Sequence, residues 1–152
     1  GIRDYKVTGV QTCALPIWDG PLVLKGIQRV DDAVRARDAG VDGIALSNHG
    51  GRQLDDAPSP VSLIEPVRQA VGDGLTIVCD GGVRRGSDIV KALALGADLC
   101  SIGRPYLYAM GAAGERGVDH LIGFLREGLE RTMALTGSRR IDEIDRDLVE
   151  WR

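Results

Sequence analysis

A histidine and an arginine stand close together in a glycine-containing stretch, where their types and spacing could serve acid–base chemistry. His49 precedes Arg52 by three residues in the run Ser47-Asn48-His49-Gly50-Gly51-Arg52-Gln53. An imidazole can accept a proton near neutral pH, and a guanidinium can hold a carboxylate through two parallel hydrogen bonds. The pair therefore indicates a catalytic base beside a substrate anchor, with a purely structural role as the alternative. The other histidine, His120, falls on a predicted surface helix and is given no role.

Two further loops combine glycine with arginine. They read Asp80-Gly81-Gly82-Val83-Arg84-Arg85-Gly86 and Gly103-Arg104-Pro105. Glycine lets the backbone approach a ligand closely, and arginine supplies several donors to phosphate oxygens. The alternative is a tight turn with solvated arginines. We predict a phosphate site, although these loops alone do not say which molecule carries the phosphate.

Short apolar runs alternate with helical patterns at a spacing of roughly 30 residues, which is typical of βαβ units. Each candidate loop directly follows one of the apolar runs. Ser87 is a plausible N-cap for the third helix, and Gly137 ends the last one. The expected strands are residues 22–24, 43–46, 75–79 and 99–102, and the expected helices are residues 31–39, 61–71, 89–95 and 118–135.

This repeat predicts an α/β fold that forms half of an eight-stranded barrel. Active sites of such barrels lie at the C-terminal ends of the strands, and the loops after strands seven and eight often hold phosphate. The predicted fold is thus the C-terminal half, strands five to eight, of a (β/α)8 TIM barrel. An open doubly wound sheet is the alternative, but the first turn after a strand lacks the G-x-G-x-x-G loop.

Composition favours an ordinary globular protein. The 152 residues are 43% hydrophobic and 27% charged, and the net charge of −3 argues against a general nucleic-acid binder. No run approaches the length of a membrane span. Cys79 and Cys100 lie in apolar runs without metal-ligand spacing, so we expect neither a metal site nor a disulfide. We expect a cytoplasmic location, and peripheral membrane attachment of the intact protein stays open.

The first seventeen residues have no clear period and match the translation of a short-read library adapter. Residues 7–17 fit the adapter itself, residues 1–4 fit the upstream part of the same primer, and residues 5–6 fall where a sample index would lie. A natural N-terminal arm is the alternative. We expect residues 1–17 to be non-biological and residues 18–152 to form one domain.

From Gly20 to about Gly137, the sequence resembles the FMN-dependent α-hydroxy acid dehydrogenases, which include glycolate oxidase, flavocytochrome L-lactate dehydrogenase and mandelate dehydrogenase. The resemblance rests on Leu24-Lys25-Gly26, on residues 47–55 and 80–97, and on Ile102-Gly103-Arg104-Pro105. The last two pieces alone also resemble inosine monophosphate dehydrogenase. The alternatives are an inosine monophosphate dehydrogenase-like enzyme, a flavin-dependent isomerase or a non-catalytic remnant. The first two enzyme classes lack the adjacent histidine and arginine.

The resemblance implies FMN as cofactor and oxidation of a small L-2-hydroxy acid, such as lactate, glycolate or mandelate, to the 2-oxo acid. His49 would be the base and Arg52 the carboxylate clamp. The resemblance also implies an electron acceptor that is oxygen, quinone or a cytochrome, and a homo-oligomeric intact protein. The residues expected at the flavin are Lys25 near N1 and O2, Ser47, then Asp80, Gly81, Gly82, Val83 and Arg84 at the ribityl and phosphate, and Gly103 and Arg104 at the phosphate.

The family's carboxylate partner of the histidine and its substrate tyrosines belong to the other half of the barrel. Without the carboxylate, the imidazole loses the support that orients it and stabilises its charge. We therefore expect the chain alone to be catalytically poor.

Overall fold

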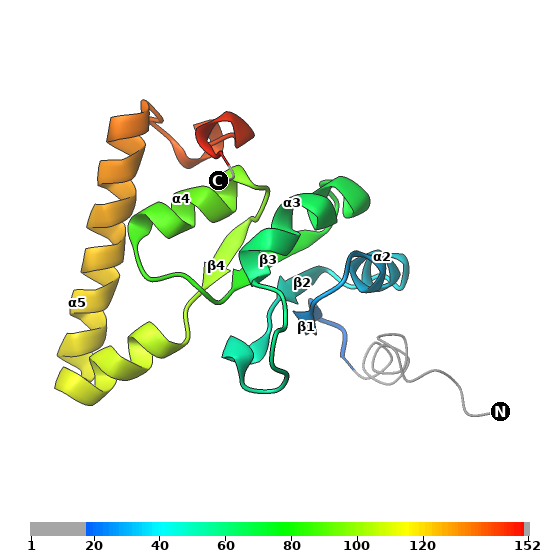
Figure 1. The fold of residues 1–152 in the computed structure, drawn as a ribbon, viewed down its shortest axis with the longest axis horizontal. Coiled ribbons are helices and arrows are strands. Elements are labelled where there is room, and N and C mark those ends of the chain that lie inside the picture. Colours follow the sequence, from blue (N-terminus) through cyan, green and yellow to red (C-terminus); the bar gives the residue numbers. More distant parts are fainter. Residues whose placement is uncertain (1–17, 151–152) are drawn as a thin grey trace.

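The computed structural model describes residues 18–150 and shows an α/β fold built on one parallel sheet (Figure 1). The sheet order is β1-β2-β3-β4, the same as the chain order, and all three strand pairings are parallel. The second strand has the predicted bounds, and the others differ from prediction by one to three residues at an end. The expected division after residue 17 lies at the edge of the described residues and stays a prediction. The strands are β1 (Val23–Ile27), β2 (Gly43–Leu46), β3 (Thr76–Asp80) and β4 (Leu99–Ser101).

Helices connect the strands as predicted, but one cap differs from the prediction. Three helices lie between strands: α2 (Val30–Asp38), α3 (Pro60–Val71) and α4 (Gly86–Ala94). Ser87 is not the N-cap of α4, because the cap is Arg85, two residues earlier, and the helix begins at Gly86. The carboxylate of Asp88 instead accepts hydrogen bonds from the backbone N–H groups of Arg84 and Arg85, at 2.9 and 3.0 Å. A carboxylate in the first turn is also favoured by the helix dipole.

The last helix, α5 (Arg104–Thr136), begins well before the predicted position and is broken once. Ala113 and Gly114 have non-helical backbone angles, so the helix has a kink there (Figure 1). The kink separates a short front part, residues 104–112, from a long rear part, residues 115–136. The rear part crosses α4 closely, since a side chain at Gly86 would overlap the backbone of Gly128 and Leu129. Two short 3₁₀ turns, η2 (Ile141–Glu143) and η3 (Arg146–Leu148), complete the described chain.

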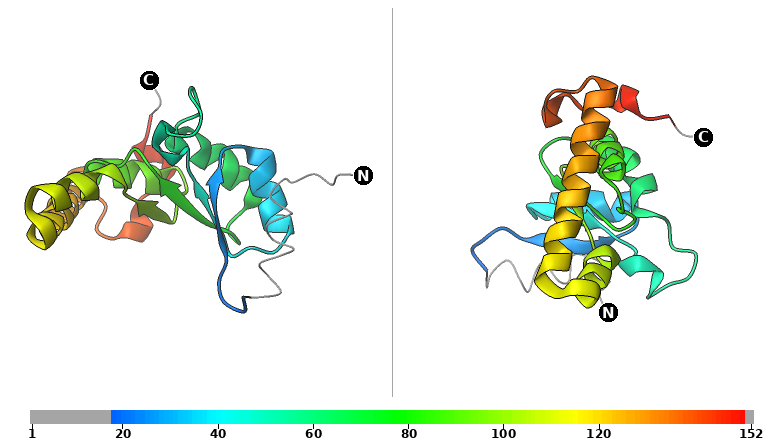
Figure 2. Two further views of the ribbon diagram at one scale, coloured as in Figure 1. Left: turned by 90° about the horizontal axis from the view of Figure 1, so that it is seen from below. Right: turned by 90° about the vertical axis from the view of Figure 1, so that its left-hand side faces the viewer.

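The two faces of the sheet differ at its edge strands. Ile44, Leu46, Ile77 and Cys79 are fully or almost fully buried in a core shared with α2, α3 and α4. On the opposite face, Val23 is 49% exposed and Leu99 is 57% exposed. Helices on one face and strands in simple chain order fit a piece of a barrel wall better than a doubly wound sheet, which has helices on both faces. Figure 2 shows α5 standing apart from the sheet beside α4.

No helix within residues 18–150 is long and apolar enough to cross a membrane.

Candidate active site

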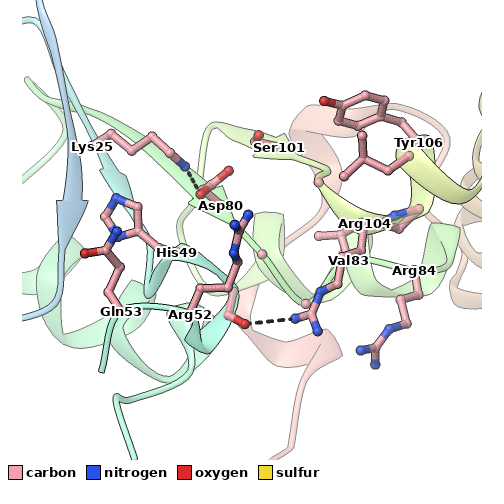
Figure 3. A pocket seen from close by; sticks show the side chains of 16 residues that line it. Lys25, His49, Arg52, Gln53, Asp80, Val83, Arg84, Ser101, Arg104 and Tyr106 are labelled. Atoms are coloured by element: carbon pink, nitrogen blue, oxygen red, sulfur yellow. Dashed lines mark hydrogen bonds and ion pairs between the residues drawn. The ribbon is translucent and has the colours of Figure 1, made fainter. Parts of the chain in front are cut away.

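A cavity of about 460 Å³ opens at the C-terminal ends of the four strands. Its wall is built from Lys25 of β1, the last residues of β3 and β4, the loop after β2, the loop after β3 and the start of α5 (Figure 3). This volume lies in the range of small-ligand and cofactor sites. The lining residues are Lys25, His49, Gly50, Arg52, Gln53, Asp80, Gly81, Gly82, Val83, Arg84, Ser101, Gly103, Arg104, Pro105, Tyr106 and Leu107.

Asp80 is the centre of a polar cluster on the floor of this cavity. Its Oδ2 atom forms an ion pair with the ammonium of Lys25 and accepts a hydrogen bond from the hydroxyl of Ser47 at 2.5 Å. Lys25 Nζ also donates to Ser47 Oγ at 3.3 Å. The side chain of Asp80 is only 17% exposed, whereas that of Lys25 is 53% exposed. The ammonium of Lys25 is therefore bound by Asp80, while its side chain stays accessible from the cavity (Figure 3).

The surroundings of Asp80 lower its pKa. Burial is the largest single effect and raises the pKa of Asp80. Hydrogen bonds from Lys25, Ser47 and Ser101 and the charge of Lys25 together outweigh burial, so the pKa falls below the ordinary 3.8. Because the folded-state pKa lies below the unfolded one, the ionised carboxylate stabilises the fold above about pH 4. That stabilisation is lost as the pH falls through the folded-state pKa.

We expect Asp80→Asn to flatten the acid side of the stability profile. The variant loses the ion pair with Lys25, so it should be less stable than the parent at neutral pH. The difference should shrink as the pH falls below about 4, where the parent's carboxylate also becomes protonated. Urea unfolding of both chains at several pH values between 3 and 7 measures this. A difference that stays constant over the whole range would contradict the assigned ionisation.

The loop after β2 presents His49 to the cavity through a short 3₁₀ turn, η1 (His49–Gly51). The hydroxyl of Ser47 accepts the backbone N–H of His49 at 3.1 Å, and the side chain of Asn48 accepts that of Gly50 at 3.0 Å. His49 itself has a positive φ of 53°, which a non-glycine residue rarely adopts. Strain of this kind persists only where the surrounding contacts over-determine it, and it often occurs at functional sites.

The cavity wall is strongly cationic although the protein carries a net negative charge. Lys25, Arg52, Arg84 and Arg104 line it, with Asp80 as the one carboxylate among the lining residues. Within residues 18–150, no acidic side chain pairs with Arg52, Arg84 or Arg104. Arg104 donates instead to the backbone carbonyl of Gly50 at 3.3 Å, which links the start of α5 to the histidine loop. Exposed guanidinium groups and glycine N–H groups around one cavity are suited to binding an anion.

Ten of the eleven predicted site residues lie on this cavity wall. The exception is Ser47, which is 1% exposed and lies behind the wall, bound to Asp80. Its direct contact with a ligand stays a prediction. Sequence reasoning missed Ser101, Tyr106 and Leu107, which also line the cavity. Ser101 could have been found, because it is the last residue of β4 and pairs in register with Asp80.

The two cysteines of the described region are both unpaired. Burial raises the pKa of the Cys79 thiol to about 12 and that of the Cys100 thiol to about 11. Both are thus neutral thiols at physiological pH and poor nucleophiles. No group of three His, Cys, Asp or Glu side chains in residues 18–150 could hold a metal ion.

Sequence comparisons identify a protein family and several relatives of this chain. The family model described as FMN-dependent dehydrogenase matches residues 14–151. A peroxisomal (S)-2-hydroxyacid oxidase of Arabidopsis thaliana is 50% identical over 164 residues, covering 97% of this chain and 45% of that protein. An L-lactate dehydrogenase of Caulobacter sp. (strain K31) is 47% identical over 132 residues, covering 87% and 35%. A pre-mycofactocin synthase of Mycolicibacterium smegmatis is 47% identical over 127 residues, covering 84% and 32%. The chain thus spans less than half the length of these relatives.

Solved structures of similar sequence share the fold. A mandelate oxidase variant carrying a monooxide FMN adduct superposes with a TM-score of 0.86 at 42% identity, covering 91% of this chain and 44% of that one. A flavocytochrome b2 variant superposes with a TM-score of 0.90 at 38% identity, covering 97% and 39%. The family match over most of the chain, at this level of identity, decides the assignment: this chain belongs to the FMN-dependent dehydrogenase family.

Proposed function

We propose that this chain forms the C-terminal half, strands five to eight, of the (β/α)8 barrel of an enzyme that oxidises a small L-2-hydroxy acid to the 2-oxo acid. One observation carries the proposal: His49 and Arg52 share a single cavity with the cationic glycine loops, in a chain of an FMN-dependent family. The hydroxyacid oxidase, the lactate dehydrogenase and the mandelate oxidase among its relatives support a 2-hydroxy acid as substrate.

The residues on the cavity wall fit FMN. The flavin accepts two electrons when bound. In our proposal the ammonium of Lys25, open to the cavity above Asp80, lies near N1 and O2 of the flavin ring, where a cation favours reduction. Ser47 lies behind the cavity wall and is hydrogen-bonded to both Lys25 and Asp80. The glycines and Arg84 after β3 face the ribityl chain and phosphate, and Gly103 and Arg104 complete the phosphate site at the N-terminus of α5.

The substrate end of the cavity is assigned to His49 and Arg52. The guanidinium of Arg52 is exposed and holds the substrate carboxylate through its fork of donors. The imidazole of His49 takes the proton released when the 2-hydroxy acid is oxidised. Fixing the substrate by its carboxylate places the reacting carbon in a constant position relative to the base, which lowers the entropic part of the barrier.

We further propose that these 152 residues alone turn over slowly. Within residues 18–150, no carboxylate contacts the imidazole of His49, and the edge-strand residues Val23 and Leu99 are exposed on one face of the sheet. A base without an orienting partner is less effective, and a cavity open on one side admits water. Residues from the rest of the barrel would supply both the partner and the missing wall.

A chimera tests the proposed function. Residues 18–150 replace the matching part of the Caulobacter L-lactate dehydrogenase, to which the chain is 47% identical. We expect the purified lactate dehydrogenase chimera to contain FMN, and its flavin to be reduced anaerobically by lactate, glycolate or mandelate. Oxygen, quinone and cytochrome are then compared as acceptors. A chimera that binds FMN but is reduced by no 2-hydroxy acid would refute the substrate class and favour the chemistry of the pre-mycofactocin synthase relatives. A folded chimera without flavin would refute the cofactor site.

We expect Arg104→Ala to weaken FMN retention by the lactate dehydrogenase chimera. The substitution removes a charge-assisted contact with the phosphate, worth on the order of 1.5–3 kcal/mol, so the dissociation constant should rise by roughly 10- to 150-fold. Fluorescence titration of the apo-chimera with FMN measures it. Arg116→Ala is the matched control, because Arg116 is an exposed arginine of the same helix that does not line the cavity. Equal affinities of the two variants would remove Arg104 from the phosphate site.

A further inference from the structure

Strand β1 contains one residue more than its partner at the point where it reaches the cavity. Lys25 pairs with Ala45 and Ile27 with Leu46, so Gly26 is an extra residue between two consecutive pairings. Gly26 has a φ of +100°, which favours glycine. In a regular strand, residues two apart point to the same face. Here Lys25 reaches Asp80 in the cavity, whereas Ile27 is 5% exposed in the core.

The missing side chain of Gly26 leaves the space where the imidazole of His49 stands. A Cβ atom at position 26 would lie 2.8 Å from Cε1 of His49, with both ring nitrogens less than 4 Å away. That separation is shorter than a normal carbon–carbon contact of about 3.5–4.0 Å. The three atoms nearest to that position all belong to the ring of His49. The contact joins the end of β1 to a residue on the loop after β2.

We propose that Gly26 is a positioning residue for His49. The bulge lets Ile27 return to the core although Lys25, two residues earlier, faces the cavity. The bare Cα of Gly26 forms the seat of the imidazole, so this glycine places the base next to the strand that carries the cation. β-Bulges next to active sites commonly redirect a side chain in this way. The inference rests on the proposed function for the meaning of His49 as base, but the contact itself does not depend on it. Any side chain at position 26 displaces the ring.

Deuterium exchange at Cε1 of the histidines in the 152-residue chain tests the seat directly. Mass spectrometry reads this exchange separately for His49 and for His120, which lies on α5 and serves as internal reference. Gly26→Ala should change the exchange rate of His49 and leave that of His120 unchanged. Gly40→Ala is the matched control, because Gly40 also has a positive φ, +84°, but no atom lies within 4 Å of its Cβ position. An unchanged rate at His49 in Gly26→Ala, or an equal change in Gly40→Ala, would overturn the proposal.

A double-mutant cycle covers the case in which Gly26→Ala mainly destabilises the chain. Urea unfolding is measured for Gly26→Ala in the parent and in a His49→Ala background. If the ring occupies the seat, the alanine should lower the folding equilibrium constant about fivefold more in the parent than in the background that lacks the ring. Equal losses in both backgrounds would show that only backbone strain is at work, and the seat would be refuted. Neither measurement requires FMN or a hydroxy acid, so failure here is separate from failure of the proposed function.

Discussion

Replacing His49 with glutamine is expected to slow reduction of the flavin in the lactate dehydrogenase chimera by roughly 10²–10⁴-fold. Glutamine keeps a similar size and some hydrogen bonding but cannot accept the proton. FMN should stay bound, because the phosphate site is assigned to other residues of the cavity. Anaerobic stopped-flow mixing with lactate, glycolate and mandelate measures the rate. If the variant reduces its flavin as fast as the parent with every acid that the parent accepts, His49 is not the base.

Arg52→Lys is the comparison variant for the same experiment, since it changes binding rather than proton transfer. Lysine keeps the charge but loses the fork that holds a carboxylate in one orientation. We expect the substrate concentration needed for half-maximal reduction to rise, together with a smaller fall in the limiting rate. The two variants thus separate the base from the anchor, and identical behaviour would argue against distinct roles.

The second large effect is expected on the stability of the fold. It concerns Arg68, whose contacts lie at the N-terminal ends of the strands, opposite the cavity. The guanidinium of Arg68 on α3 donates to the backbone carbonyls of Gly96 at 2.8 Å, Gly72 at 2.6 Å and Leu75 at 3.1 Å. It also bonds the carboxylate of Asp98 at 2.5 Å, and its side chain is only 16% exposed. One arginine therefore ties together the chain segments that lead into β3 and β4.

Arg68→Met should lower the free energy of unfolding by about 2–4 kcal/mol. It removes the donor to the partly buried carbonyls of Gly96 and Leu75 and the positive charge beside Asp98, whose carboxylate keeps the backbone N–H of Ile77. Urea unfolding measures the loss. Arg126→Met is the control: Arg126 pairs with Glu130 at 2.9 Å on the surface of α5, and such exposed pairs contribute only about 0.3–0.5 kcal/mol. Similar losses in both variants would show that the Arg68 network contributes no more than a surface ion pair.

The sequence predicted the order and type of the main elements because their signals are local. Each strand is a short apolar run, and each of the first three helices shows one apolar face, so period and length suffice. The front part of α5 was missed because its apolar residues, including Leu107 and Tyr108, are exposed and follow no buried stripe. The Arg68 network could not be predicted either, since it joins segments up to 30 residues apart that meet only after the strands pair.

The candidate site was predictable in its parts but not in its geometry. Polar residues directly after parallel strands must meet at one edge of the sheet, and this brought His49, Arg52, Arg84 and Arg104 to one cavity. The ion pair of Lys25 with Asp80 depends on strand register, and the bulge that follows Lys25 in β1 was not revealed by any residue pattern. Ser47 looked like a loop residue in the sequence, whereas its hydrogen bonds draw it behind the wall.

The break at Ala113 and Gly114 divides α5 into two helical segments with different surroundings. The rear part packs against α4, whereas the front part carries Arg104 and Tyr106 at the cavity and has exposed apolar side chains. A break in a helix can divide it into separate cooperative units, so we expect the two parts to differ in amide protection. Ligand occupancy would then slow amide exchange in the front part without altering the rear part. The helix would act as two segments, one that responds to the anion and one that stays anchored.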